Sequence, residues 1–529
     1  MNPFSGRSKC AARAAFVMVA ITTLLFAAGC GFGFGGGGNG GGGGGGGQLL
    51  NGNYSNTSLK GQYLFSLTGV GVNQTVTGSD FFSEAGVFTA DGNGNLNILD
   101  DDFNQSGQLF PLNGTATGTY HINKDGTGFL IFNYSVRVNY QITLIDDTHF
   151  YLTEQDTFAT GSGSGEKQDT SGFGSIPSGT FAFKMHNLGT TARVGAIGIS
   201  AGNIAGFEDL LVAGSTIQAQ NPPTPITGLI ETPPDANGRG QFNVDGVLLY
   251  YYVVSSAPSS GKFRFLSRTG SLHTGQAEVQ TGGPYSNATL AANTSYVFGG
   301  SGETGSVFGG VHSAGVFTSD GNQHITAGVF DYTQDGSVFS NQMLQTTNAG
   351  TYSVDPTTGR VILNLNPQSG LANQKILWLV SPTRAYFVAN NASTVEDGAV
   401  TLQQGSPFSN SNLNGQAALF MDGFDTAFKD RSGALLPGGS GSLKWSSLAD
   451  SFDVNANGGI GSGTLSSQLF TTGTYQVSSN GRVTVTVKNL NNSTDSSTVF
   501  YLTSANSGFM VQEDQQVNIG GAFAAQSGQ

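Results

Sequence analysis

The sequence predicts an all-β protein built from four tandem antiparallel β domains of about 115–120 residues, each a roughly eight-stranded up-and-down barrel. Three observations predict it: motifs that recur at that spacing, apolar and polar residues that alternate with period two, and Asp-Gly and Asn-Gly turns between the alternating segments. A two-sheet β-sandwich is the alternative. The barrel is favoured because consecutive hairpins form a meander, and closure removes exposed strand edges.

Three motifs mark the repeat. A short apolar strand opens each unit, at 61–65, 179–183, 293–298 and 415–420. A Phe-led turn segment rich in Asp, Asn and Gly follows at 88–93, 317–322 and 452–458. A Gly-Thr-Tyr segment comes next, at 118–120, 350–352 and 473–475, and the second unit has a less similar version at 227–229. The unit has the size of a lipocalin-like barrel, but that analogy concerns the fold alone.

The first 30 residues have the charge order of an export signal. Basic residues at 7, 9 and 13 precede an apolar run over 14–28, and no acidic residue precedes Cys30. A permanent membrane-spanning helix needs about 20 apolar residues, more than this run contains. The run ends in Ala27-Ala28-Gly29-Cys30, which resembles the lipobox of bacterial lipoproteins. The resemblance implies cleavage before Cys30 and lipid on its thiol; an ordinary signal peptide with a chance cysteine is the alternative.

A flexible tether is expected next, because residues 31–47 are almost pure glycine. Such a coil reaches roughly 20–25 Å. Cys10, the other cysteine, lies in the segment that would be removed, so no disulfide is expected and each domain relies on its own core. The predicted organisation is a signal peptide over 1–29, lipidated Cys30 with the tether over 30–55, and β repeats over 56–170, 171–285, 286–406 and 407–529.

Charge and the lipobox bear on location and partners. The net charge is −13, and loss of the three basic residues of the signal leaves about −16. Nucleic acid is therefore not expected as a partner, because phosphate binding depends on clustered Lys and Arg. The lipobox implies attachment to a membrane of the cell envelope through Cys30. The outer membrane or cell surface is favoured, since Gly31 stands where an Asp retains some lipoproteins at the inner membrane.

No catalytic residue is predicted. A Ser or Cys nucleophile needs a base, usually His, within hydrogen-bond reach. The histidines do not recur at equivalent repeat positions, and the last unit has none, so they are interpreted as surface or strand-filling residues. They are His121, His149, His186, His273, His312 and His324.

Calcium binding is a weak hypothesis at Asp453, Asn455 and Asn457, which match the first half of an EF-hand loop. The twelfth position of such a loop needs a bidentate acid, and this chain has Thr464 there. Asp91 begins a similar segment at the same repeat position. A hairpin turn explains both segments, so no metal and no other cofactor is predicted.

Paired carboxylates for glycoside hydrolysis are the remaining enzymatic hypothesis. The candidates stand on neighbouring predicted strands of the first unit, and we expect their side chains to lie on a solvated face. They are Asp100, Asp101, Asp102, Glu154 and Asp156.

The favoured function is therefore a non-enzymatic surface protein, either a spacer or a module that binds glycan or another envelope component through loops at the barrel ends. The alternative is a carrier of a small apolar ligand inside the barrels. An extracellular hydrolase is a weaker alternative. Inward-facing side chains distinguish the first two, because a barrel filled with Phe and Leu has no room for cargo. The oligomeric state does not follow from the sequence.

Overall fold

The computed structural model describes residues 52–527 apart from short internal segments. Those segments are 72–80, 113, 136, 156–158, 189, 269, 305–308, 371–372, 425–427, 455–460, 467–469 and 490–494. Cys10, the lipobox with Cys30, and the glycine-rich segment lie outside the described residues. The described chain is β-structure with four short 3-10 helices: η1 (Asn56–Ser58), η2 (Thr170–Gly172), η3 (Asn287–Thr289) and η4 (Asn410–Asn412).

The strands group into four consecutive barrels. Barrel 1 contains β1 (Lys60–Gly71), β2 (Phe81–Asp91), β3 (Asn95–Gln105), β4 (Gln108–Pro111), β5 (Ala116–Ile122), β6 (Thr127–Asn133), β7 (Arg137–Leu144), β8 (His149–Gln155) and β9 (Ala159–Lys167). Barrel 2 contains β10 (Gly179–Asn187), β11 (Thr191–Ser200), β12 (Asn203–Val212), β13 (Thr224–Thr232), β14 (Arg239–Val244), β15 (Val247–Ser255), β16 (Lys262–Ser267) and β17 (His273–Val279).

Barrels 3 and 4 follow the same order. Barrel 3 contains β18 (Thr294–Thr304), β19 (Gly310–Ser319), β20 (His324–Gln334), β21 (Ser337–Met343), β22 (Gly350–Val354), β23 (Arg360–Leu365), β24 (Asn373–Ser381), β25 (Arg384–Ala389) and β26 (Thr394–Leu402). Barrel 4 contains β27 (Ala417–Phe424), β28 (Phe428–Pro437), β29 (Ser442–Val454), β30 (Gly461–Ser466), β31 (Phe470–Val477), β32 (Arg482–Asn489), β33 (Asp495–Ser504), β34 (Ser507–Gln512) and β35 (Asn518–Ala525).

Each unit closes into an eight-stranded antiparallel barrel, which confirms the predicted barrel over the sandwich. In each unit every strand pairs with its neighbour, and the last strand pairs back with the first, as β9 does with β1 and β17 with β10. Barrels 1, 3 and 4 each have one additional strand, which forms a hairpin with the third strand of the barrel. These additional strands are β4, β21 and β30. Closure pairs the backbone groups that an open sheet would leave at its edges.

The barrels are filled by apolar side chains at one end. In barrel 1 the residues that alternate inward include Tyr63, Phe65, Phe88 and Phe150, all buried in one cluster. The tyrosine of the Gly-Thr-Tyr motif closes this end: the Tyr120 hydroxyl donates to two carbonyls of the segment around η1. Tyr352 and Tyr475 donate in the same way to the segments around η3 and η4.

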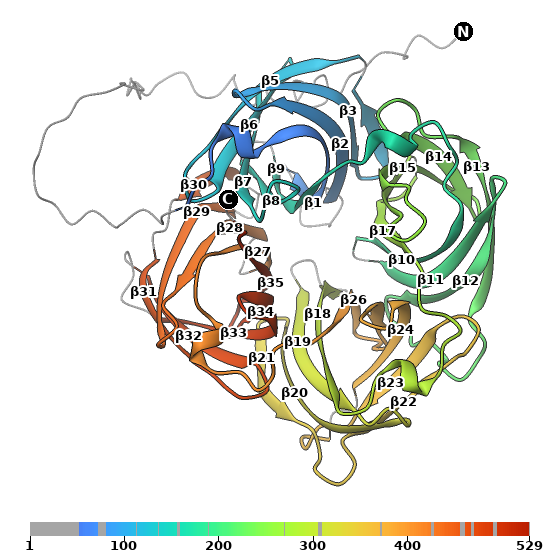
Figure 1. The fold of residues 1–529 in the computed structure, drawn as a ribbon, viewed down its shortest axis with the longest axis vertical. Helices are drawn as coiled ribbons and strands as arrows, with labels where there is room; N and C mark the ends of the chain where they lie inside the picture. Colours follow the sequence, from blue (N-terminus) through green and yellow to red (C-terminus); the bar gives the residue numbers. More distant parts are fainter. Residues whose placement is uncertain are drawn as a thin grey trace, which may run out of the picture.

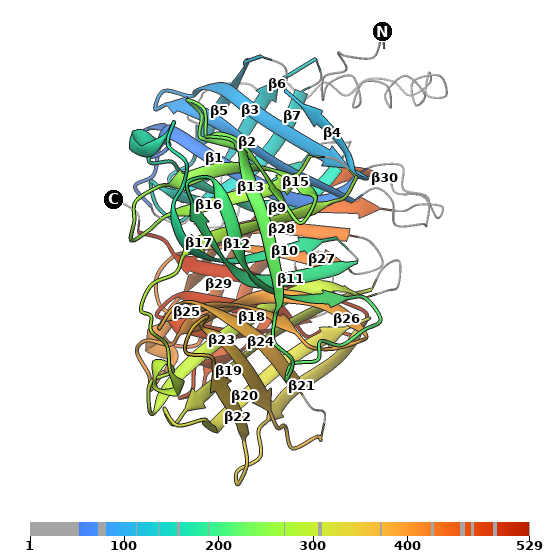
Figure 2. The ribbon, with the colours of Figure 1, turned by 90° about the vertical axis from the view of Figure 1, so that its right-hand side faces the viewer.

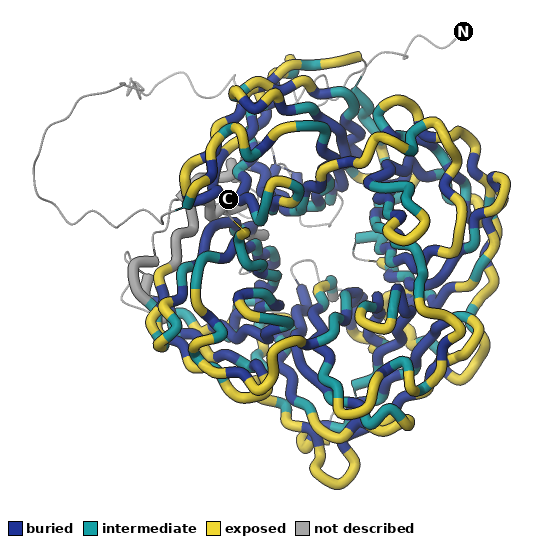
Figure 3. The backbone as a smooth tube through the Cα atoms, viewed as in Figure 1, coloured by how far each residue is buried: buried dark blue, intermediate teal, exposed yellow. Residues whose placement is uncertain are grey.

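The four barrels form a closed ring around a common centre, with their first and last strands innermost (Figure 1). The segments that join successive barrels, and the C-terminus, lie on one side of this ring, which we call the linker face; the opposite side is the free face (Figure 2). Exposed residues gather on the outer wall and at the ends of the strands, while the walls between barrels are buried (Figure 3).

One glutamine stands at the exit of every barrel and binds the next barrel. Its side-chain amide donates to two backbone carbonyls there, as Gln280 does to Thr358 at 2.9 Å and Leu379 at 2.7 Å. Gln168 and Gln403 bind their following barrels in the same way. Gln526, near the C-terminus, binds carbonyls of barrel 1 and so completes the ring.

Candidate functional sites at the barrel mouths and junctions

The mouth of barrel 1 at the free face holds carboxyl groups inside the barrel. Glu84 on β2 accepts a hydrogen bond of 2.7 Å from the Tyr140 hydroxyl on β7. Glu154 on β8 stands directly opposite Tyr140 and is fully buried. On β3, Asp101 accepts a hydrogen bond from the Tyr134 hydroxyl. Glu154 and Asp101 belong to the predicted set of carboxylates.

The expectation that these carboxylates face solvent is wrong. Glu154, Asp101 and Asp102 are each about 1% exposed or less. Successive side chains do alternate between the two faces of these strands, but neither face meets solvent. Glu154 and Asp101 point into the barrel, and Asp102 points into the junction with barrel 2. Asp100 hydrogen-bonds Asn237 of barrel 2, and burial raises the pKa of its carboxyl to about 6. Asp156 lies outside the described residues.

Glu84 was missed by the sequence reasoning. It sits inside a strand, with no second acid at a recognisable spacing. One signal in the sequence indicated that Glu84 points inward. It is separated by an even number of residues from Phe82 and Phe88, two aromatic residues of the same strand that point into the core. A carboxyl on an apolar face needs a buried partner, which Tyr140 supplies.

Barrels 2 and 3 also bury charged groups in their mouths, but with different residues. In barrel 2, Arg193 binds Glu208 at 3.0 Å, and burial lowers the pKa of nearby His273 to about 4. In barrel 3, Lys375 lies 3.4 Å from Glu396 and is 1% exposed at its side chain. The described charged groups in the mouths of barrels 1, 2 and 3 therefore do not form one repeated set.

Three junctions between barrels share a latch made of an arginine, an aspartate and an aromatic donor. At the junction of barrels 2 and 3, Arg360 binds Asp209 through two nitrogens at 2.7 and 2.6 Å, and the Trp378 indole donates to the same carboxylate at 2.9 Å. Such a planar two-point contact is the strongest geometry for an Arg–carboxylate pair. The other two latches are Arg239 and Tyr252 on Asp102, and Arg482 and Tyr501 on Asp331.

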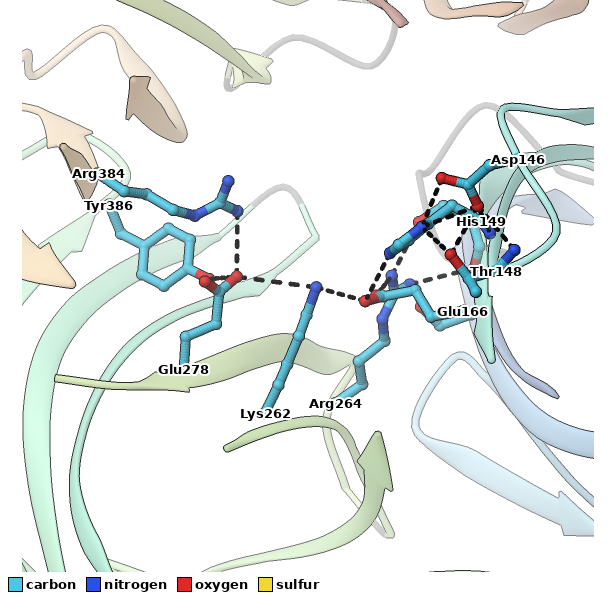
Figure 4. Close-up of polar contacts among 11 residues, drawn as sticks. Asp146, Thr148, His149, Glu166, Lys262, Arg264, Glu278, Arg384 and Tyr386 are labelled. Carbon is cyan, nitrogen blue, oxygen red and sulfur yellow. Dashed lines mark hydrogen bonds and ion pairs between the residues drawn. The ribbon is translucent and has the colours of Figure 1, made fainter. Parts of the chain in front are cut away.

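A second set of charges links barrels 1, 2 and 3 near the linker face (Figure 4). Glu166 on β9 accepts a hydrogen bond of 2.7 Å from Lys262 and contacts Arg264, both on β16 of barrel 2. Burial opposes ionisation of Glu166, but the two cations outweigh it and hold its pKa well below the usual range. His149, the first residue of β8, lies 4.0 Å from Glu166 and extends the network to Asp146 at 3.2 Å.

The same arrangement repeats one barrel further on. Glu278 on β17 contacts Arg384 at 3.0 Å and accepts a hydrogen bond of 2.6 Å from the Tyr386 hydroxyl, both on β25 of barrel 3 (Figure 4). Lys262 lies 3.7 Å from Glu278 and joins the two groups. The network therefore fastens neighbouring barrels together.

The junction of barrels 3 and 4 contains a carboxyl pair that predicts a pH-dependent stability. Burial and a hydrogen bond with Asp331 raise the pKa of Glu513 to about 7. Arg482, Tyr501 and Ser340 also face this pair. Because the folded-state pKa lies above the unfolded one, the proton on Glu513 favours folding at low pH, and this contribution is lost as the pH rises from about 4.5 to about 7.

Glu513→Gln is therefore expected to stabilise the protein at pH 8 by on the order of 1–2 kcal/mol, discounted for partial exposure, and to leave it unchanged at pH 5. Urea unfolding of both proteins at the two pH values measures this. An equal effect at pH 5 and pH 8 contradicts the raised pKa.

The six histidines lie at strand ends and turns, inside barrels or at junctions. His121, His149 and His324 are exposed at strand ends or turns, while His273 and His312 are buried. His186, partly buried, lies 3.2 Å from Asp397 of barrel 3. Among the described residues no group of three or more His, Cys, Asp or Glu is arranged to hold a metal ion.

The proposed calcium segments are hairpin turns where the structure describes them. The Asp91 carboxylate accepts hydrogen bonds from the backbone amides of Asn93 at 2.7 Å and Asn95 at 3.0 Å. Asp320 binds its turn in the same way. Asn455 and Asn457 lie outside the described residues, and for Asp453 only the backbone within β29 is described.

The helices of the described part are all too short or too polar to cross a membrane. No protein-family model and no curated protein sequence matches this chain.

Proposed function

We propose that this protein is a lipid-anchored platform of the cell envelope, without enzymatic activity, that presents a ring of four barrels to the surroundings. One observation carries the proposal. In a chain poor in charge, several charged residues form buried pairs between barrels, as Arg360 with Asp209 and Glu166 with Arg264. Residues bound in this way hold barrels 1 and 2, 2 and 3, and 3 and 4 together.

The start of the described chain supports an orientation of the ring relative to the membrane. Tyr54, near the start of the described chain, donates to the Ile145 carbonyl on the linker face. We therefore propose that the linker face turns toward the membrane, since the described chain begins there. The free face then points outward, where its loops and polar barrel mouths are available to a glycan or another envelope component.

Packing favours the platform over the carrier of an apolar ligand. The described interiors of all four barrels contain clusters of buried aromatic and branched side chains. A hollow in barrel 2, lined by Ile197, Phe242 and Phe263 among others, is too narrow for a water molecule. Barrels filled by their own side chains leave no space for cargo.

Cys30→Ser tests the anchor. The variant is expected to move from the membrane pellet to the soluble fraction, because at least two acyl chains are needed for stable attachment and this thiol would carry them. Immunoblots of fractionated cells measure the distribution. Cys10→Ser is the matched control and should remain in the pellet. A Cys30→Ser protein that pellets as completely as the parent contradicts the anchor and the orientation derived from it.

A further inference from the structure

Three of the four junctions combine a latch with an apolar wall. Between barrels 1 and 2 the wall contains Leu64, Val87, Tyr250 and Leu266. The corresponding clusters between barrels 2 and 3 and between barrels 3 and 4 are equally apolar, with Trp378 and Tyr501 in the place of Tyr252. Separating such walls exposes apolar surface to water and also leaves a buried ion pair unpaired.

The fourth junction, between barrels 4 and 1, lacks all three parts of the latch. The strand register places Thr127 where the other barrels have the latch arginine, and Thr143, paired with Thr127, where they have the aromatic donor. Ala449, opposite Ser432, stands where they have the aspartate. The three replacements occur together, so no partner is left unpaired.

The wall of this junction contains polar side chains where its side chains are described. Strand β28 of barrel 4 packs on β7 and β8 of barrel 1. Thr153 on β8 and Ser432 on β28 are both fully buried, and their hydroxyls lie 3.0 Å apart. The residues equivalent to Thr153 in the other barrels are Leu266, Val388 and Val511. No apolar cluster of the kind found at the other junctions bridges barrels 4 and 1 within the described part of the chain.

Further contacts cross this junction besides the Thr153–Ser432 pair, and one is aromatic. The rings of Tyr151 and Phe420 lie 4.7 Å apart across it. The C-terminal segment adds more: Gln526 donates to the Asp125 and Leu144 carbonyls, and the Ser527 amide donates to the Ile145 carbonyl. Gln416, at the start of barrel 4, also donates to the Asp125 carbonyl, at 2.6 Å. At the other junctions the chain that follows the equivalent glutamine enters the adjacent barrel, so a covalent connection crosses there as well.

We infer that the junction between barrels 4 and 1 is a seam at which the ring opens, with the C-terminal segment around Gln526 as its clasp. Hydroxyl groups that meet across the closed seam bind water once it opens, so opening there costs far less than at an apolar wall. The other three junctions stay closed because their latches and walls remain. Opening turns the ring into an arc and exposes the outer faces of β7, β8 and β28.

Pairwise spin labels test the seam. Lys124, Ala236, Thr357 and Ser479 are exposed and occupy equivalent turns on the linker face of the four barrels. Full-length protein with Cys10→Ser and Cys30→Ser receives one pair of label cysteines at a time. Electron–electron distance distributions are then measured for the seam pair 124–479 and for the pairs 124–236, 236–357 and 357–479.

The seam pair is expected to show a second, longer distance that grows at least twofold in population with Gln526→Ala. The other pairs should each give one narrow distance, unchanged by the matched variants Gln168→Ala, Gln280→Ala and Gln403→Ala. Installing the latch with Thr127→Arg, Thr143→Tyr and Ala449→Asp should remove the longer distance if that protein folds. A seam pair as narrow as the others and insensitive to Gln526→Ala overturns the inference, as does equal broadening of all four pairs.

Discussion

Arg360→Ala is expected to destabilise the protein by about 3–5 kcal/mol, because it leaves a buried carboxylate without its cation. The Arg360 and Asp209 side chains are 7% and 2% exposed. Removing the guanidinium leaves Asp209 with the Trp378 indole, a neutral donor that does not balance the charge. The bond from Arg360 to the Ala219 carbonyl, at 3.0 Å, is lost as well. Urea unfolding followed by tryptophan fluorescence measures the loss.

Arg384→Ala is the matched control at the same junction. Its side chain is 37% exposed, and Glu278 keeps contacts with Lys262 and Tyr386 when it is removed. We expect a loss of about 1 kcal/mol or less, as for an exposed ion pair. The double variant Arg360→Met with Asp209→Leu should recover most of the stability, because it removes both charges together. If Arg360→Ala costs no more than Arg384→Ala, the latch does not hold the two barrels together.

Lys375→Met is expected to destabilise barrel 3 by about 3–5 kcal/mol. The Lys375 ammonium lies 4.7 and 4.4 Å from the ring centres of Phe298 and Phe387 inside the barrel. Methionine replaces the stem but leaves the Glu396 carboxylate buried with Ser313, a neutral donor. Thermal unfolding followed by circular dichroism measures the change.

The double variant Lys375→Met with Glu396→Leu separates the charge effect from packing. It is expected to be as stable as the parent or more stable by about 1–4 kcal/mol, because apolar groups of similar size replace both members of the pair. Lys444→Met, at an exposed lysine of barrel 4, should change stability by about 0.5 kcal/mol at most. A double variant that loses more stability than Lys375→Met alone contradicts a purely electrostatic cost.

The barrels could be predicted because their signals are local. Turn residues such as Asp91 and Asp320 bind backbone amides two and four residues away, so the pattern that specifies a hairpin lies within a few positions. Motif spacing then made the four units visible. The Gly-Thr-Tyr motif marked equivalent positions before its role was known, and the structure shows each tyrosine closing a barrel end.

The junctions could not be predicted in the same way. Arg239, Arg360 and Arg482 follow the glycine of a turn and resemble ordinary solvent-facing residues, yet each reaches an aspartate in the preceding barrel. One signal was present in two strands. Residues 248–254 are a continuous run of apolar or aromatic residues, and so are residues 375–380 apart from Lys375. In a strand with one face exposed to solvent, apolar and polar residues alternate instead. Such runs indicate strands buried on both faces, which is what a barrel packed against another barrel requires.

By itself, the sequence determined the repeat, the all-β class and the barrel, since alternation and turns act over neighbouring residues. It also contains a motif that resembles a lipobox, and lipidation of Cys30 remains a prediction. Only the tertiary structure decided that the barrels form a ring, that Glu84 and Glu154 lie inside barrel 1, and that three junctions have latches and one does not. Alternation defines two faces of a strand, but which face meets the core, another barrel or water depends on contacts between residues more than 100 positions apart.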